Sequence, residues 1–288
     1  MTAEAAVPNS SGTSWPRLEA PDHACDAHIH IYDPRFLPAG SQARLAENAA
    51  VPDYRRLQAR TGTSRAVVVT PAAYHTDNRV TLDAIRSLGE GNTRGVAVVH
   101  PDVTDAELEA MDEGGVRGIR FTLFDPATAV TNFDMVEPLA HRVAELGWHV
   151  QLHWRADQIV PHADLLDRLP CTIVFDHMAR LPQPQGAAHE AFGIVERLMQ
   201  KGRTWVKLSG PYLDSHGPAY EGGEGVAKAF VRAAPERLVW GSDWPHPTEK
   251  DVKPDDAVLF DLLGDWAGDA GLWRRILVDN PARLYGFA

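Results

Sequence analysis

The feature that most limits the folds open to this sequence is an alternation of short apolar runs with amphipathic helical patterns, which continues from Ala24 to the C-terminal end. Several runs, for example residues 66–69 and 172–175, are largely apolar. Strands have this composition when both of their faces are buried, as in a parallel sheet. Eight strands are therefore expected, at residues 25–31, 65–69, 95–100, 118–123, 149–154, 172–177, 204–208 and 237–242.

Helical patterns fill the intervals between these runs, and some of them carry end signals. Thr104 is followed three residues later by Glu107, which is a capping box typical of a helix N-terminus. The pattern over residues 133–146 ends at Gly147, a residue type common at helix C-termini. Helices are expected at residues 53–60, 80–88, 104–113, 133–146, 159–169, 189–200, 225–234 and 256–264, with one more at 271–278.

Eight strands that alternate with eight helices predict an α/β fold, a single-domain (β/α)₈ TIM barrel over residues 22–288. The length of 288 residues suits a barrel, which takes ~250. The alternative is an open doubly wound sheet, which usually has a glycine-rich phosphate loop after its first strand. Here the first strand runs into residues 31–34, which contain no glycine. Residues 1–21 are expected to be a flexible, polar lead-in.

Composition excludes several classes of partner. The net charge is −11 and no run of lysines and arginines occurs, which works against nucleic-acid binding. No stretch of 18 apolar residues is present, so no membrane span and no membrane partner are expected. The two cysteines, Cys25 and Cys171, are too few for a disulfide framework and are typical of a reducing compartment. These features predict a cytoplasmic protein whose partner is a small molecule.

Histidines and an aspartate stand at the C-terminal ends of the expected strands. His28 and His30 are two residues apart on the first strand, so their side chains lie on one face. The fifth, sixth and eighth strands end at or near His153, His177 and Asp243. Barrel enzymes hold their catalytic residues at this end of the strands. Because imidazoles with a carboxylate are a suitable ligand set for zinc or manganese, the sequence predicts a catalytic site with a divalent ion.

A histidine pair on the first strand, single histidines on the fifth and sixth, and an aspartate on the eighth resemble the amidohydrolase superfamily. Longer stretches are similar to its 2-pyrone-4,6-dicarboxylate lactonase group, and the similarity covers nearly the whole chain from Ala24. That group consists largely of lactonases, with some sugar-lactone isomerases. The resemblance therefore implies a hydrolase that opens a small, often anionic lactone. The stretches are residues 26–30, 76–78, 118–121, 175–180, 240–247 and 280–285.

The resemblance also implies roles for single residues. Asp243 would be the general base that activates water, and His177 would hydrogen-bond the carbonyl or the developing oxyanion. Arg120, at the end of the fourth strand, would bind a substrate anion; since a guanidinium cannot ligate a metal, one ion at most is expected. Other candidates for substrate binding are Tyr74, Tyr212 and His246, and the expected ligands of the zinc or manganese ion are His28, His30, His153 and Asp243.

Two alternatives stay open at this point. The pyrone lactonase resembles a metal-independent variant that uses further arginines after the fourth and seventh strands, whereas residues 121–126 and 209–214 here contain no basic residue. This difference favours a metal-dependent lactonase with a less charged substrate, such as a muconolactone-like or sugar lactone, over a pyrone; in a metal-independent mechanism the histidines would instead donate hydrogen bonds to the carbonyl. The other alternative is a metal-dependent decarboxylase of the same superfamily, or a lactone isomerase.

Overall fold

Within the residues that the computed structural model describes, 6–38, 41–215, 217 and 220–288, eight strands form one parallel sheet in sequence order. The first five residues of the expected lead-in lie outside the described residues. Because every neighbouring pair is parallel, the C-terminal ends of all strands lie on one rim. The strands are β1 (Cys25–Ile29), β2 (Arg65–Val69), β3 (Thr93–Ala97), β4 (Val116–Thr122), β5 (His149–His153), β6 (Thr172–Phe175), β7 (Thr204–Leu208) and β8 (Leu238–Trp240).

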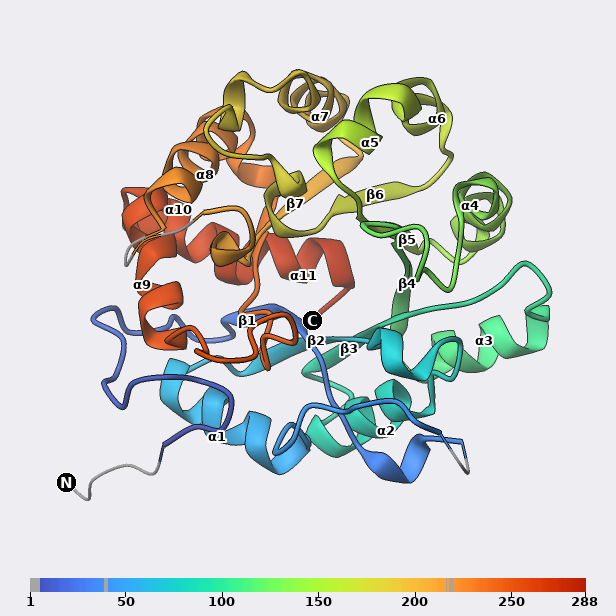
Figure 1. Cartoon of the computed structure of the whole chain (residues 1–288), viewed down its shortest axis with the longest axis horizontal. Helices are drawn as coiled ribbons and strands as arrows, with labels where there is room; N and C mark the ends of the chain where they lie inside the picture. The colour runs from blue at the N-terminus through green and yellow to red at the C-terminus, as the bar shows by residue number, and fades with distance from the viewer. Residues whose placement is uncertain (1–5, 39–40, 216, 218–219) are drawn as a thin grey trace.

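The sheet closes on itself between its first and last strands. Ile29 of β1 forms a parallel bridge with Trp244, which lies just beyond β8. The backbone N–H of His30 donates to the Trp244 carbonyl, and that of Asp243 donates to the His28 carbonyl, both at 2.9 Å. The fold is therefore the (β/α)₈ barrel that the sequence predicted, and Figure 1 shows its strands inside a ring of helices.

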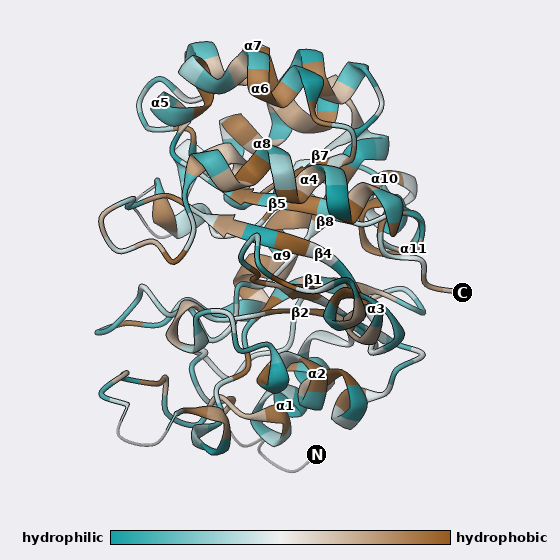
Figure 2. Cartoon of the chain, turned by 90° about the vertical axis from the view of Figure 1, so that its right-hand side faces the viewer, coloured by the Kyte–Doolittle hydropathy of each residue, from teal (hydrophilic) through white to brown (hydrophobic). Residues whose placement is uncertain are grey.

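Helices cover the outside of the barrel and shield the apolar strands from solvent. Figure 2 shows mostly hydrophobic strands within, and hydrophilic residues on the outer faces of helices such as α7. The helices are α1 (Val51–Thr61), α2 (Arg79–Leu88), α3 (Asp105–Glu113), α4 (Val136–Glu145), α5 (Ala156–Ile159), α6 (Ala163–Arg168), α7 (Glu190–Gln200), α8 (Glu221–Ala233), α9 (Asp256–Ala267), α10 (Ala270–Arg274) and α11 (Asn280–Tyr285). The predicted capping box is confirmed, since Thr104 and Glu107 exchange hydrogen bonds at the start of α3.

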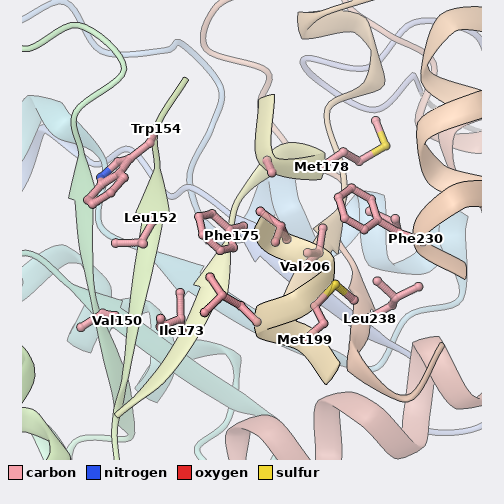
Figure 3. Packing of buried hydrophobic residues seen from close by; sticks show 14 of the residues in the cluster. Val150, Leu152, Trp154, Ile173, Phe175, Met178, Met199, Val206, Phe230 and Leu238 are labelled. Carbon is pink, nitrogen blue, oxygen red and sulfur yellow. The ribbon is translucent and has the colours of Figure 1, made fainter. Parts of the chain in front are cut away.

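The layer between strands and helices is packed with large apolar side chains. Figure 3 shows Phe175 of β6 and Val206 of β7 in one cluster with Met199 of α7 and Phe230 of α8. Phe175, Val206 and Phe230 have no exposed surface, and Met199 has almost none. Each such side chain contributes about 1.5–3 kcal/mol through burial, which makes this layer the main source of stability on that side of the barrel.

The opposite end of the barrel from the strand C-termini is closed by the end of the chain. Tyr285 of α11 and Phe287 pack in one cluster with barrel-interior side chains such as Val67 and Val174. The interior is therefore filled with apolar side chains towards this end. Most polar side chains of the barrel interior lie towards the other rim, where the strands end.

The helical boundaries near prolines differ from the prediction. The expected helix at 159–169 is interrupted by a tight turn that contains Pro161, followed by α6. The expected helix at 271–278 is α10 followed by one π-helical turn, and Pro281 then lies in the first turn of α11, which was not expected. Proline is tolerated in a first helical turn because the missing N–H has no partner there, so it marks a start as readily as a stop.

The described part of the expected lead-in, residues 6–21, makes tertiary contacts with the barrel. Val7 is buried, and the indole N–H of Trp244 donates to the Pro8 carbonyl at 2.8 Å. Arg60 of α1 donates to the carbonyl oxygens of Ser11 and Ser14. This segment therefore lies against the outside of α1 and the turn after β8.

Among the described residues, no helix combines the length and apolarity that a membrane crossing requires.

Candidate active site

A bulge in β1 turns two consecutive side chains into the barrel. Asp26 pairs with Ala66 and Ile29 with Val68, so β1 has one residue more than β2 over this interval. Ala27 packs among the interior valines, whereas Ile29 packs on the helix side. Bulges of this kind re-aim side chains next to active sites. Here the extra residue brings His28, as well as His30, to the inside of the rim.

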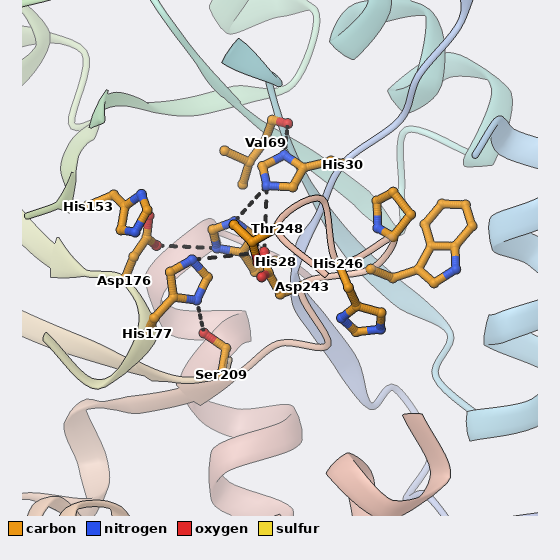
Figure 4. A network of polar contacts seen from close by, with 12 residues as sticks. His28, His30, Val69, His153, Asp176, His177, Ser209, Asp243, His246 and Thr248 are labelled. Atoms are coloured by element: carbon orange, nitrogen blue, oxygen red, sulfur yellow. Dashed lines mark hydrogen bonds and ion pairs between the residues drawn. The ribbon is translucent and has the colours of Figure 1, made fainter. Parts of the chain in front are cut away.

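Three histidines surround one oxygen of Asp243. The Nε2 atoms of His28 and His30 lie 3.2 Å apart, and each is 3.6 Å from Asp243 Oδ1. His177 approaches the same oxygen with its Nε2 at 3.9 Å. All four side chains are buried, and Figure 4 shows them converging from three parts of the barrel. The structure thus brings together four of the residues that the sequence placed in the site.

The Nδ1 atoms of these rings, which point away from Asp243, also have polar contacts. His30 Nδ1 lies 2.8 Å from the Val69 carbonyl oxygen; because a carbonyl only accepts, Nδ1 carries the hydrogen and Nε2 presents its lone pair to the centre. His28 Nδ1 lies 3.2 Å from Asp176 Oδ1, and His177 Nδ1 lies 2.9 Å from the Ser209 hydroxyl. Partners of this type fix ring orientation in metal-binding and catalytic histidines.

Burial and mutual contact set the charges of the centre. Burial lowers the pKa of His28 well below its usual value and that of His177 to about 4, so both rings are neutral at pH 7. Burial alone would raise the pKa of Asp243, but His177, His30 and His28 hold it well below its usual value. The centre is therefore a carboxylate with a lowered pKa, surrounded closely by imidazole rings.

This donor set fits a single divalent ion. Two groups could hold one among the described residues: His28, His30 and Asp243 form the first, and His28, Asp176 and His177 form the second. Ligand atoms at ~2.0–2.2 Å around a tetrahedral ion are roughly 3.3–3.6 Å apart. The separations of 3.2 and 3.6 Å in the first group match this spacing. Two imidazole nitrogens and one carboxylate oxygen are also a suitable ligand set for a dication.

A buried ionic network, which the sequence prediction missed, lies beneath the histidines. Asp176 Oδ2 accepts hydrogen bonds from Arg120 Nε at 2.8 Å and Gln151 Nε2 at 3.1 Å. Lys207 donates to Gln151 Oε1 and lies 3.7 Å from Asp176 Oδ1 and 3.2 Å from His28 Nδ1. Burial lowers the pKa of Lys207 to about 8. A lysine within the otherwise apolar run of β7 was the available signal for this network.

A cavity of about 180 Å³ lies at the ends of β2 to β5, and one of its wall residues, His153, has its ring centroid 5.0 Å from that of His177. Arg120 reaches it from β4; only its Nε contacts Asp176, and its terminal nitrogens make no hydrogen bond within the described part of the chain. The cavity suits a ligand with one small ring. Its walls also include Thr70, Ala72, His75, Val98, Thr122, Phe124, Thr128, Val130 and His153.

His153 lies at this cavity and not in either donor group. Its Nε2 is 3.0 Å from Nη1 of Arg180, and a guanidinium can only donate, so this contact occupies the Nε2 lone pair. The ring stacks on Phe124 with centroids 5.4 Å apart. The centroid of His177 is only 5.0 Å away, yet no dashed line joins His153 to the centre in Figure 4. The structure therefore places His153 beside the expected metal ligands but turned towards another partner.

The remaining candidates lie in different places. The Tyr74 hydroxyl is hydrogen-bonded to the backbone N–H and carbonyl of Asp33, which joins two loops above β1 and β2. Tyr212 donates to Asp243 Oδ2 at 2.7 Å and is 2.9 Å from His246 Nδ1. Tyr212 and His246 are buried behind Asp243, away from the cavity walls.

Left-handed backbone conformations are concentrated around the centre. His177, Met178, Ala179 and Arg180 have φ angles of 48°, 54°, 57° and 49°, and Asp243 has 65°. Non-glycine residues in sparsely populated regions cost of order 1–3 kcal/mol each and are found mainly at functional sites. The turn after β6 brings both His177 and Arg180 towards the rim, which is consistent with a functional role.

Comparison with known proteins gives matches over nearly the whole chain. A family model described as amidohydrolase matches residues 25–287. The chain is 36% identical over 284 residues to a 2-pyrone-4,6-dicarboxylate hydrolase of Comamonas testosteroni, covering 94% of this chain and 93% of the relative. It is 34% identical over 277 residues to a 4-sulfomuconolactone hydrolase of Hydrogenophaga intermedia, covering 94% and 91% respectively. A crystal structure of an Agrobacterium tumefaciens protein superposes with a TM-score of 0.87 at 26% identity, covering 97% of this chain and 99% of that one.

Proposed function

The chain belongs to the amidohydrolase family, and from that premise we propose that it hydrolyses a small anionic lactone with water activated at the Asp243 carboxylate. The observation that carries the proposal is the position of Asp243 Oδ1, with three histidine Nε2 atoms at 3.6 to 3.9 Å. An ionised carboxylate beside a ligand-sized cavity is suited to take a proton from water as it attacks a bound ester. The lactones named for the two sequence relatives support this substrate class.

We infer that His28, His30 and Asp243 hold one divalent ion, zinc or manganese. When bound, such an ion polarises the ester carbonyl and lowers the pKa of a nearby water. Three protein ligands with a remaining open position are typical of catalytic zinc sites. The resemblance implied His153 as a further ligand; we propose instead that it forms a wall of the substrate cavity, because its Nε2 faces Arg180.

We assign a separate role in the reaction to each of three side chains. Asp243 accepts the proton of the attacking water and returns it to the ring oxygen when the ester bond breaks. His177 donates from Nε2 to the carbonyl oxygen, with the Ser209 hydroxyl donating to its Nδ1 at 2.9 Å. Arg120 binds the substrate carboxylate with its terminal nitrogens. The two cysteines are unpaired and buried, which supports our proposal of a cytoplasmic location.

The direct test is a panel of neutral and anionic lactones incubated with purified protein of known metal content. Ring opening by water releases one proton per turnover at neutral pH, which a pH indicator records. Release of carbon dioxide from a carboxylate substrate would point to the decarboxylase alternative. A product of unchanged mass and charge, detected by NMR without proton release, would point to a lactone isomerase.

Arg120→Met is expected to separate substrate binding from chemistry. The variant removes the positive charge at the cavity, so KM should rise strongly for an anionic lactone and little for a neutral one. The measurement is kcat and KM for a matched pair of lactones with and without a carboxylate. An equal rise of KM for both lactones would contradict the assignment of Arg120 to the substrate anion.

Metal removal is expected to abolish hydrolysis, and zinc or manganese should restore it. Two matched variants test the ligand set: His30→Gln should reduce metal affinity by more than ~100-fold, since even outer-shell changes cost 10–100-fold. His153→Gln should leave the affinity nearly unchanged. Metal content and dissociation constants are measured with a competing chelator. Full activity in metal-free protein would instead support the metal-independent mechanism.

A further inference from the structure

A chain of hydrogen bonds runs from Asp243 to the first turn of α9 through groups that have no place in the mechanism above. Tyr212 contacts Asp243 Oδ2 at 2.7 Å and His246 Nδ1 at 2.9 Å. On its other side, His246 Nε2 lies 3.2 Å from Asp256 Oδ2. His246 and Asp256 have no exposed surface, and Tyr212 and Asp243 have very little. Such a chain can hold the Asp243 carboxylate in one orientation through residues that lie behind it.

The protons in this chain can be placed by elimination. The Tyr212 hydroxyl donates to Asp243 Oδ2 at 2.7 Å, because a carboxylate oxygen accepts. The Tyr212 oxygen is then free to accept, and His246 Nδ1 must carry a hydrogen that it donates to that oxygen. His246 Nε2 and Asp256 Oδ2 share one more proton, whichever of the two atoms carries it. The His246–Asp256 pair thus directs the hydroxyl of Tyr212 to Asp243.

Backbone contacts hold the chain in place. The backbone N–H of His246 donates to the Asp243 carbonyl at 2.8 Å, which closes a tight turn behind the carboxylate. Lys253 donates to the His246 carbonyl at 2.7 Å. The N–H of Asp256 donates to Ser10 Oγ at 3.2 Å, so the N-terminal segment also supports the end of the chain.

We propose that Tyr212, His246 and Asp256 are positioning residues that occupy Oδ2 of Asp243 and leave Oδ1 as the single oxygen that moves the proton. This inference rests on the proposed function and deepens it. Oδ1 accepts a proton while the water oxygen bonds to the carbonyl carbon. The same proton passes to the ring oxygen when the carbon–oxygen bond of the ester breaks, so atoms and charge balance. Throughout, Oδ2 keeps its hydrogen bond to Tyr212, so Oδ1 stays directed at the attacking water and the ring oxygen.

Tyr212→Phe is expected to lower kcat by roughly 10- to 100-fold with KM changed less than about threefold, because small misplacements of a reacting group have effects of this size. The matched control is Tyr285→Phe, the same change in a buried tyrosine at the closed end of the barrel. The Tyr285 hydroxyl has no hydrogen-bond partner within the described residues. A rise of KM with unchanged kcat would overturn the proposal and make Tyr212 a substrate contact.

Asp256→Leu and Asp256→Asn test the remote end of the chain, since Asp256 touches neither substrate nor Asp243. Asparagine can donate its NH2 to His246 Nε2 and so keep the hydrogen on Nδ1, whereas Asp256→Leu leaves Nε2 without that partner and frees the ring. We expect kcat to fall in Asp256→Leu and to stay near the wild-type value in Asp256→Asn, and the double variant of Asp256→Leu with Tyr212→Phe to be no slower than Tyr212→Phe alone. Losses that multiply in the double variant would contradict a shared pathway.

A spectroscopic readout tests the chain without any substrate. In ¹⁵N-histidine-labelled protein, the His246 ring, assigned by its loss in His246→Gln, should show a hydrogen on Nδ1 in the wild type. In Asp256→Asn that hydrogen should stay on Nδ1, and Nε2 should carry none. A wild-type His246 without a hydrogen on Nδ1 would overturn the chain even in an active enzyme. A wild type that opens no lactone would contradict the proposed function and not this result.

Discussion

Asp243→Asn is expected to reduce lactone turnover by at least ~10²–10⁴-fold, the contribution of a general base. Asp243 Oδ1 is the carboxylate oxygen that lies among the Nε2 atoms of His28, His30 and His177, and an amide oxygen cannot take the proton of water at neutral pH. The loss should appear in kcat and in kcat/KM alike, since the proton moves only in the transition state. Proton release from the best lactone of the panel provides the measurement.

Metal loss must be separated from loss of the base in this variant. The assay is therefore run at saturating zinc or manganese, with bound metal measured in the same samples. Asp265→Asn is the matched control, because Asp265 pairs with Arg17 on the exposed face of α9, far from the rim. Both variants should unfold near the wild-type temperature. Wild-type turnover in metal-loaded Asp243→Asn would remove Asp243 from the role of base and with it the mechanism proposed here.

The rim of the site could be predicted from the sequence because a parallel barrel brings strand ends together. Once the strands were recognised from apolar runs, His28, His30, His177 and Asp243 had to lie on one rim, and the structure places them there. The prediction needed only local periodicity and the closure of the sheet. The resemblance to the amidohydrolases is likewise confirmed by the family match over residues 25–287.

The directions in which individual side chains point could not be predicted from the sequence pattern. His153 ends its strand like the other histidines, but the left-handed turn after β6 brings Arg180 to its Nε2, and no local signal in β5 reports that contact. The bulge that turns His28 inward likewise depends on the pairing of β1 with β2. Lys207 and Asp176 meet only in the folded barrel, since Lys207 lies on β7 and Asp176 follows the end of the neighbouring strand β6.

Asp176→Asn is expected to destabilise the protein by about 3–5 kcal/mol, as the loss of one partner of a buried ion pair does. Asp176 is fully buried between Arg120 and Lys207, so the variant leaves two buried cations without an anion. Lys207→Met should cost less, because the Asp176–Arg120 pair remains. Denaturant unfolding of metal-free wild type and variants, all with chelator present, gives the free energies without a contribution from bound ion.

The pH dependence of this difference tests its electrostatic origin. Burial would raise the pKa of Asp176, but Arg120, His28 and Lys207 hold it well below its usual 3.8. A carboxylate with a lowered folded-state pKa contributes its full stability above the unfolded value and loses it as the pH falls through the folded value. The difference in unfolding free energy between wild type and Asp176→Asn should therefore be constant from about pH 5 to 7 and shrink in stronger acid.

Asp112→Asn is the control for burial. Asp112 accepts hydrogen bonds from Arg117 and Trp148, but its side chain is 39% exposed. This variant should therefore change stability by less than about 1 kcal/mol. Equal losses in the two variants would mean that burial of the Asp176 network contributes nothing beyond a surface pair.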